Sequence, residues 1–268
     1  KEKETVHILT TAKAIKNGNP NVVFDSGVRV SSTVVGDDSE SGIALIQVTI
    51  NFEVKPFTFL DTTALAQGAN VVVMSGRNLT TGSAVVSSGI VSEPGVWRMN
   101  GTTTWLSSML EMDTPITSIQ EGGAVIDLNG SLVGVVASQP FQGNSRMEYA
   151  ITANEIKLIY NALKTNGKVT RGALGVVVRN VSSMLAYEKS AQGINIDMKT
   201  GVYVQTVVEK KDAGDGLQVG DIITMIDGIE MSSYQDVLAR MYMHSAGDTI
   251  NVSIIRGGES KQIGVVLQ

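Results

Sequence analysis

Residues 118–134 read SIQEGGAVIDLNGSLVG, and this stretch gives the clearest view of how the chain folds. A polar loop ends in a pair of glycines, an apolar run follows, and Asn129 and Gly130 separate that run from a second one. An Asn-Gly pair between two apolar runs is a strong short-range signal for a β-hairpin. We therefore predict a loop, a strand, a tight turn and a second strand, in that order.

The rest of the chain has the composition of a folded protein rich in strands. Of its 268 residues, 43% are hydrophobic and 18% are charged, and 28 are glycines. Short runs of Val and Ile between turn residues favour β structure over helix. The absence of cysteine excludes disulfides and thiol chemistry, and two histidines without a spaced cluster make a structural zinc site improbable. We expect no cofactor and no metal.

Charge and hydropathy narrow the function further. The net charge of -5, with no cluster of Lys and Arg, argues against a nucleic-acid partner. No apolar run reaches the roughly 18 residues that a membrane-spanning helix needs. The chain opens on the residues KEKE without a signal peptide, so we expect a soluble portion excised from a longer protein.

Short strands follow one another in the first half without intervening helices, which favours a barrel or a sandwich. Besides the hairpin, we predict strands at 6–9, 22–24, 28–30, 33–35, 43–46, 70–74, 83–86 and 89–91. Residues 153–166 then place apolar side chains at helical spacing, and Gly167 supplies a stop signal. We expect this helix to link two domains.

The segment after the helix has a different pattern, in which strands alternate with helical stretches. We predict a strand at 202–207, a buried strand between two turns within 216–228, a helix at 233–243 and a closing hairpin over 250–267. The sequence therefore predicts one domain at 1–152, a linker helix and connection at 153–170, and a second domain at 171–268.

Two groups of motifs resemble a known family. The loop and hairpin at 118–134 are similar to the nucleophile loop of trypsin-like serine proteases of the HtrA type, which reads Gly-Asn-Ser-Gly-Gly-Pro-Leu-Val. Residues 171–176 (RGALGV), 216–223 (GLQVGDII) and 227–228 (DG) resemble a PDZ domain. With NGKVT at 166–170, the match is specific to HtrA-type proteases with a C-terminal PDZ domain. The resemblance implies a mainly β fold: a trypsin-like double β-barrel, its first barrel truncated at the N-terminus, followed by an α+β PDZ domain.

The resemblance also implies a Ser-His-Asp triad, but the three positions carry other residues. Lys13 stands at the histidine position, Gly42 at the aspartate position and Glu121 at the serine position. A hydroxyl nucleophile needs an adjacent base and a group that orients the base, and all three are missing. Ile119 replaces the glycine two residues before the serine, which puts the oxyanion hole in doubt. We therefore expect a catalytically inactive pseudoprotease.

Two interpretations of Lys13 remain open. It could act as the base for Ser118 in a Ser-Lys active site, or it could form a partly exposed ion pair with Glu121 in the vacated cleft. We favour the ion pair, because nothing in the sequence positions Ser118 or activates the lysine as a base. Both histidines, His7 and His244, fit structural or surface roles. Five carboxylates are of the type that binds metal ions, but their spacing matches no binding loop: Asp37, Asp38, Glu40, Glu111 and Asp113.

The resemblance to a PDZ domain implies that C-terminal or unfolded peptides of other proteins are the partners. An extended peptide would add a strand to the sheet, and a loop would bind its terminal carboxylate. We predict that loop at Ala173, Leu174, Gly175 and Val176. The apolar pocket for the last side chain would be lined by Val176, Val178, Val237, Leu238 and Met241.

The function that we predict is that of a peptide-binding scaffold or regulator without catalytic activity. The alternatives are an active serine protease with a Ser-Lys site and a chaperone-like holder of unfolded chains. The family resemblance implies export to a bacterial cell envelope, an upstream membrane anchor, and a trimer formed through a missing N-terminal segment.

Overall fold

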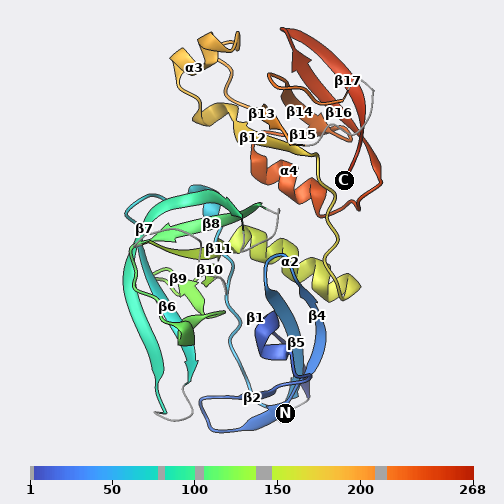
Figure 1. The fold of residues 1–268 in the computed structure, drawn as a ribbon. Coiled ribbons are helices and arrows are strands. Elements are labelled where there is room, and N and C mark those ends of the chain that lie inside the picture. The colour runs from blue at the N-terminus through green and yellow to red at the C-terminus, as the bar shows by residue number, and fades with distance from the viewer. Residues whose placement is uncertain (1–2, 78–81, 100–105, 137–146, 209–215) are drawn as a thin grey trace. The chain divides into compact units, whose positions relative to one another are not determined.

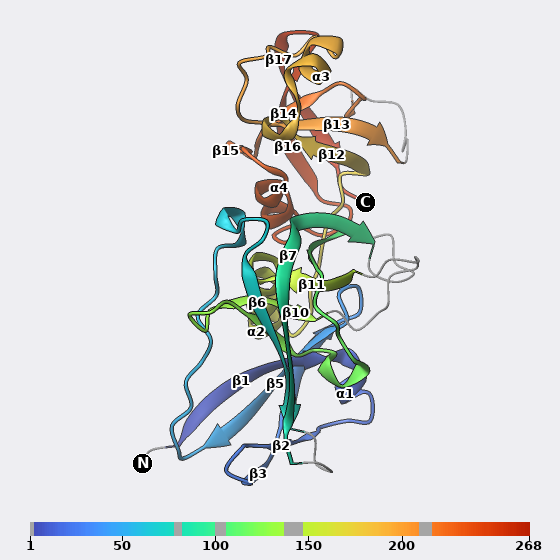
Figure 2. The same cartoon turned by 90° about the vertical axis from the view of Figure 1, so that its left-hand side faces the viewer.

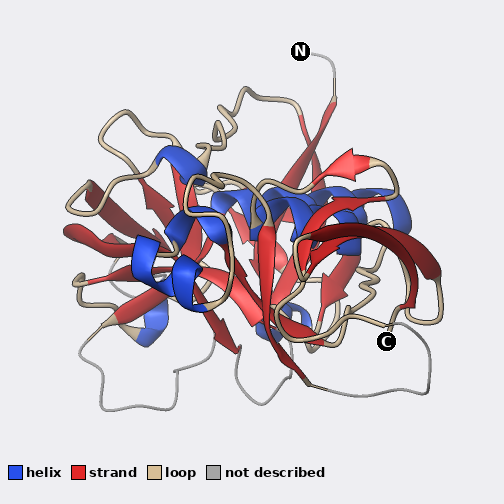
Figure 3. Cartoon of the chain, turned by 90° about the horizontal axis from the view of Figure 1, so that it is seen from above, coloured by secondary structure: helices blue, strands red, loops and turns tan. Residues whose placement is uncertain are grey.

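The computed structural model describes residues 3–77, 82–99, 106–136, 147–208 and 216–268. The chain divides into two compact units, Lys1–Val169 and Thr170–Gln268. Strands dominate both units, as the red arrows of Figure 3 show, and the helices are few and mostly short. Each unit has its own buried apolar core.

The first half of unit 1 forms an open, antiparallel sheet (blue in Figure 1). Its central strand β5 (Ile43–Ile50) pairs with β1 (Glu4–Thr11) on one side and with β4 (Thr33–Asp38) on the other. Six of the eight β5 side chains are buried, as expected of a central strand that is covered on both faces. A separate ribbon consists of β2 (Asn21–Val23) and β3 (Arg29–Ser31). Among the described residues, this half is an incomplete barrel.

The second half of unit 1 is a closed barrel of six strands in the order β10-β11-β8-β7-β6-β9. Nine apolar residues form the core of this barrel: Val71, Val73, Val91, Leu110, Met112, Val125, Val133, Val136 and Ala150. The strands are β6 (Asn70–Arg77), β7 (Ala84–Met99), β8 (Leu106–Met112), β9 (Ala124–Ile126), β10 (Leu132–Val136) and β11 (Glu148–Thr152).

The hairpin predicted at 118–134 is present, because β9 pairs antiparallel with β10 across the turn that contains Gly130. The prediction of two strands at 83–86 and 89–91 was wrong, because β7 runs through both without a break. Ser87, Ser88 and Gly89 look like turn residues, but each pairs with a residue of β6. Pairing with a neighbouring strand overrides their local preference. Strands β8 and β11 were not predicted.

Helix α2 (Ala153–Asn166) has the bounds predicted from the sequence and is the longest helix in the described part of the chain. It begins after Thr152, whose hydroxyl accepts a hydrogen bond from the Glu155 amide, and it ends before Gly167. It packs on β4 and β5 of the open sheet and on β10 and β11 of the barrel. The helix therefore holds the two halves of unit 1 together.

Unit 2 is built on an antiparallel sheet in the order β12-β13-β14-β16-β17, with a short strand β15 beside β14. Strand β12 forms one edge of the sheet. The strands are β12 (Val176–Asn180), β13 (Val202–Val207), β14 (Ile222–Ile226), β15 (Ile229–Glu230), β16 (Thr249–Arg256) and β17 (Glu259–Val266). The helices are α3 (Ala186–Ala191) and α4 (Tyr234–Met241).

The expected fold class is confirmed: the protein is mainly β, with a closed barrel in unit 1 followed by an α+β unit. The first barrel, expected to be truncated, is the open sheet described above. No helix among the described residues is long and apolar enough to cross a membrane.

Candidate functional site

The three residues predicted at the triad positions lie on three separate segments of unit 1 that meet beside the short helix α1 (Ala12–Ile15). Lys13 belongs to α1, and the amide of Ala12 donates to the carbonyl of Gly42 at 2.8 Å. Glu121 follows the 3₁₀ turn η2 (Ser118–Gln120), which lies next to α1 in Figure 2. A Cβ atom on Gly122 would lie 2.7 Å from the Thr11 side chain, so only glycine allows this approach of the two segments.

Lys13 and Glu121 form an ion pair across this junction. The Lys13 Nζ lies 3.1 Å from Glu121 Oε2, and the two side chains are 74% and 23% exposed. The ion pair expected from the sequence is therefore present. Because the ammonium group is exposed to solvent, the pair is of the weakly stabilising, solvated kind. No contact joins Lys13 to Ser118 among the described residues, so the geometry does not support a Ser-Lys pair.

We expect the Lys13–Glu121 pair to contribute only about 0.2–1 kcal/mol to the free energy of unfolding, because the lysine end is open to solvent. Urea denaturation of Lys13→Met, Glu121→Gln and the double variant would measure this coupling, and added salt should weaken it. A coupling of about 3 kcal/mol or more would instead indicate a desolvated pair.

The backbone at the aspartate position does not suit an ordinary side chain. Gly42 has a φ of +71°, in the left-handed region, where Asp is tolerated better than most residues but still with strain. Its amide donates to the carbonyl of Asp38 at 2.8 Å, which closes a tight turn before β5. The residue predicted at the aspartate position is thus a glycine on which this turn depends.

The loop at the serine position is held in a helical turn rather than opened toward a ligand. Within η2, the Gln120 amide donates to the Thr117 carbonyl at 2.8 Å, and the Glu121 amide donates to the Ser118 carbonyl at 3.4 Å. In the family, the amide at the serine position is one of the groups that face the oxyanion. Here that amide bonds within the turn, and Ile119 replaces the glycine that would let the backbone rotate.

Gln120 locks this turn onto the barrel, a role that no pattern in the sequence indicated. Its side chain is fully buried. The amide oxygen accepts from the Thr117 amide at 3.1 Å, and the amide nitrogen donates to the Val73 carbonyl at 3.3 Å and to the Ser87 hydroxyl at 2.9 Å. A polar residue in an exposed-looking loop has no periodicity that reveals burial, so only the tertiary contacts identify it.

Neither histidine lies at the triad. The Nδ1 atom of His7 lies 2.9 Å from the hydroxyl of Tyr160 on α2, and burial and the nearby Lys164 lower the pKa of His7. His244 follows α4 in unit 2 and lies 3.1 Å from Asp227. Within the described residues, no group of three His, Cys, Asp or Glu side chains is placed to hold a metal ion.

A second candidate site lies in unit 2, at the edge strand β12 and the loop that precedes it. Ala173 and Gln268 exchange backbone hydrogen bonds of 2.9 and 3.0 Å, which fixes the start of the loop, and the Gly175 carbonyl accepts from Val208 at 2.8 Å. The amides of Leu174 and Gly175 have no acceptor among the described residues. Gly175 has a φ of +66°. Two unpaired amides thus lie together at the end of an open sheet edge.

The side chains of β12 alternate between the two faces of the sheet, and one hydrogen bond shows which face is which. Asn180 Oδ1 accepts from the amide of Tyr234, the first residue of α4, at 2.6 Å. Residues two apart in a strand share a face, so Val178 and Val176 also face α4. Asn180 and Tyr234 were not predicted from the sequence.

The three predicted residues of α4 face the sheet, as the helical spacing required. Val237, Leu238 and Met241 are only 2 to 4% exposed. Val176 and Val178 are half-buried. Because α4 and β12 contact each other, the predicted lining residues lie on neighbouring elements, and the three on α4 are nearly covered.

Comparison with known proteins places both units. The family model for the trypsin-like peptidase domain matches residues 2–135, half of the chain, and that for the PDZ domain matches residues 172–267. "Serine protease Do-like HtrA" of Lactobacillus helveticus is 28% identical over 269 residues, which cover 98% of this chain and 63% of the relative. "Periplasmic serine endoprotease DegP" of Escherichia coli K12 is 28% identical over 265 residues, which cover 98% of this chain and 53% of the relative.

Solved structures show the same fold. The chain is similar to "HtrA-type protease AlgW with tripeptide", with a TM-score of 0.65 and 22% identity over 97% of this chain and 85% of that one. The chain spans between about half and two thirds of the length of the curated relatives described above. The chain belongs to the trypsin-like peptidase family, and within it to the HtrA type, in which this domain is followed by a PDZ domain.

Proposed function

We propose that this protein is a non-catalytic member of the HtrA type that binds peptides through its PDZ domain, with the trypsin-like domain as a scaffold or regulator. One observation carries the inactive half of the proposal. The three triad positions hold Lys13, Gly42 and Glu121, and the first and last of these neutralise each other at 3.1 Å. The relatives described above are named as proteases, so the proposed loss of activity would distinguish this chain from them.

The chemistry of the site supports inactivity in two ways. A carboxylate at the serine position carries a negative charge where a developing oxyanion would have to be stabilised. No imidazole is present to take a proton from an attacking hydroxyl, since His7 is bonded to Tyr160 on α2. The site therefore lacks both the nucleophile and the means to activate one.

The peptide-binding half of the proposal rests on the free edge of β12. An extended peptide that pairs with β12 would satisfy the backbone groups of that edge, and the amides of Leu174 and Gly175 would receive its terminal carboxylate. A protein of similar structure, the HtrA-type protease AlgW, has been solved with a tripeptide. Because the α4 side chains are nearly buried, the pocket for the last side chain is shallow, and we expect micromolar or weaker affinity.

The names of the relatives support a proposal for the location of the protein. We propose an extracytoplasmic location, since DegP is named as periplasmic. The partners would be C-terminal or unfolded peptides of other proteins. The domain bounds 1–152, 153–170 and 171–268, the upstream membrane anchor and the trimer remain proposals of the same kind.

A library of random decapeptides with free C-termini tests the binding half. We expect fluorescence polarisation to identify binders with Kd values near or above about 1 μM, and amidation of the C-terminus to weaken them by about tenfold or more, because the carboxylate loses charged hydrogen bonds. Gly175→Val is the variant that disturbs the loop proposed to bind the carboxylate. The added Cβ would lie 2.7 Å from the Gln268 side chain, and valine resists the positive φ of this position. A library without a single binder would contradict the proposal.

A further inference from the structure

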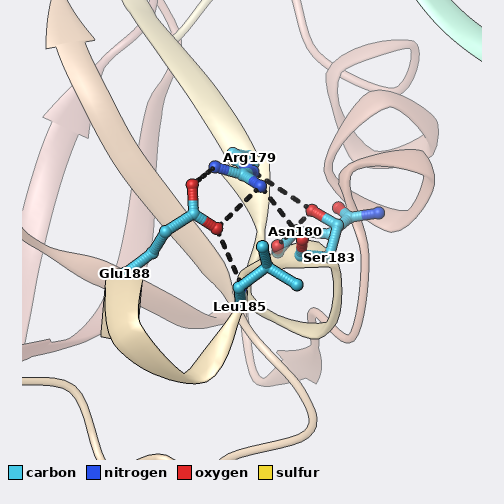
Figure 4. A network of polar contacts seen from close by, with 5 residues as sticks. All are labelled: Arg179, Asn180, Ser183, Leu185 and Glu188. Carbon is cyan, nitrogen blue, oxygen red and sulfur yellow. Dashed lines mark hydrogen bonds and ion pairs between the residues drawn. The ribbon is translucent and has the colours of Figure 1, made fainter. Parts of the chain in front are cut away.

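A network of polar contacts holds Arg179 of β12 in a fixed position beside the open sheet edge (Figure 4). Its Nη1 and Nη2 donate to the two carboxylate oxygens of Glu188 in α3, at 2.8 and 3.2 Å. Nη2 also donates to the Ser183 carbonyl at 3.0 Å, and Nε donates to the Ser183 hydroxyl at 3.3 Å. A guanidinium group has five N–H donors, so one on Nη1 has no acceptor among the described residues.

Glu188 is itself anchored, so the pair is an ordered feature rather than two loose side chains. Its Oε2 accepts from the amide of Leu185 at 2.7 Å. The hydrogen bond from Arg179, followed by that from the Leu185 amide, lowers the pKa of Glu188, which keeps the carboxylate ionised near neutral pH. The Arg179 and Glu188 side chains are 32% and 25% exposed, so a ligand at the strand edge can reach them.

The direction of a bound peptide follows from the position of the free amides. Leu174 and Gly175 precede β12, so a carboxylate bound there places the peptide's C-terminus at the start of the strand. The peptide then runs antiparallel to β12, with its last residue opposite Val176 and its fourth residue from the end opposite Arg179. Residues directly opposite each other share a face, so that fourth side chain lies beside Arg179, on the face away from α4.

We propose that Arg179 determines which residue is accepted at the fourth position from the C-terminus of a bound peptide, with a carboxylate or amide oxygen preferred over a cation. The inference rests on the proposed peptide binding and adds the specificity of that site. Arg179 is part of the edge strand β12 itself, whereas Glu188 belongs to α3, so Arg179 is the member of the pair that lies directly opposite a residue of the added strand. The free N–H on Nη1 is the donor that this side chain would use.

Glu188 limits the strength of the preference because it neutralises most of the charge of Arg179. Opposite charges on neighbouring strands contribute modestly, so we expect Glu to be preferred over Lys at this position by about 1.5- to 5-fold in Kd. The two members of the pair should then act in opposite directions. Loss of Arg179 removes the attraction and leaves the Glu188 charge, whereas loss of Glu188 leaves the guanidinium charge unopposed.

The experiment uses the full chain and the decapeptide that binds best in the library described above. Three versions of this peptide carry Glu, Gln or Lys at the fourth position from a free C-terminus, and the ratio of Kd for Lys to Kd for Glu is measured by fluorescence polarisation. We expect a ratio of about 1.5 to 5 for the unaltered protein. Arg179→Gln should bring the ratio to one or below, and Glu188→Gln should raise it above that of the unaltered protein.

The two variants remove the same ion pair, which separates specificity from a merely structural role. If the ion pair had only a structural role, both substitutions would change the ratio of Kd values in the same direction. That result would overturn the inference. Lys261→Gln, in the exposed strand β17 at the other edge of the sheet, serves as the control and should leave the ratio unchanged. Peptides that bind with a ratio of one would overturn this inference alone, whereas a library without binders would overturn the proposed function as well.

Discussion

A variant with the triad restored, Lys13→His, Gly42→Asp and Glu121→Ser, is expected to cleave casein at least about 10²-fold more slowly than an active HtrA-type relative. The unaltered chain should show no cleavage. The amide at position 121 bonds to the Ser118 carbonyl within η2, and loss of one oxyanion donor costs about 10²–10³ in rate. Aspartate at position 42 would also have to accept a φ of +71°.

Labelling with a fluorophosphonate probe measures the nucleophile separately from turnover. We expect no label on the unaltered chain and slow labelling of the restored variant at position 121. Addition of Ile119→Gly to the restored variant should increase both rates, because glycine lets the turn open and present its amide. If the unaltered chain is labelled, and Ser118→Ala abolishes the label, the protein is a Ser-Lys protease and the inactive interpretation is wrong.

Asp221→Ala in the PDZ domain is expected to lower the free energy of unfolding of that domain by about 3–5 kcal/mol. The Asp221 side chain is 1% exposed and accepts from Nε and Nη2 of Arg256 at 2.7 and 2.8 Å. It also accepts from the Gln218 amide at 2.8 Å, which closes the turn before β14. Removal of the carboxylate takes the charged partner from Arg256 and opens the turn.

Urea denaturation of the full chain, followed by hydrogen exchange of the amides in β13 and β16, would measure this loss within the PDZ domain. Glu259→Gln is the matched control, because Glu259 and Lys261 form an ion pair of 3.8 Å whose side chains are 78% and 47% exposed. Its expected effect is within about 1 kcal/mol. If the two substitutions lowered the free energy of unfolding equally, burial of the Asp221–Arg256 pair would contribute nothing to the stability of the PDZ domain.

Local patterns in the sequence predicted the architecture well. The hairpin at 118–134 and helix α2 were visible because their signals, an Asn-Gly turn and helical spacing before a glycine, act over a few neighbouring residues. The domain order followed from motifs that occur in one family. The prediction of a break within β7 was wrong because the signal there is not local. Ser87, Ser88 and Gly89 are held in the strand by pairing with β6, and the local preferences of these residues do not reveal that pairing.

The identity of the residues at the triad positions is a property of the sequence alone. Under the proposed assignment, Lys13, Gly42 and Glu121 lack the base, the orienting carboxylate and the nucleophile of the usual acyl-transfer chemistry. What the sequence could not determine is how the vacated site is held. Burial of Gln120, the turn that occupies the Glu121 amide and the ion pair at 3.1 Å depend on how segments far apart in the chain pack together.

In the PDZ domain, too, local features could be predicted from the sequence, whereas contacts between distant segments could not. The sequence predicted which residues share a face of β12 and of α4, because alternation in a strand and spacing in a helix are local rules. Only the tertiary structure showed that Asn180 bonds to α4 and that Arg179 on the opposite face is held by Glu188. A hydrogen bond between distant segments depends on how the chain packs, and no periodicity in the sequence encodes it; for this reason the specificity of the groove could be inferred only from the folded structure.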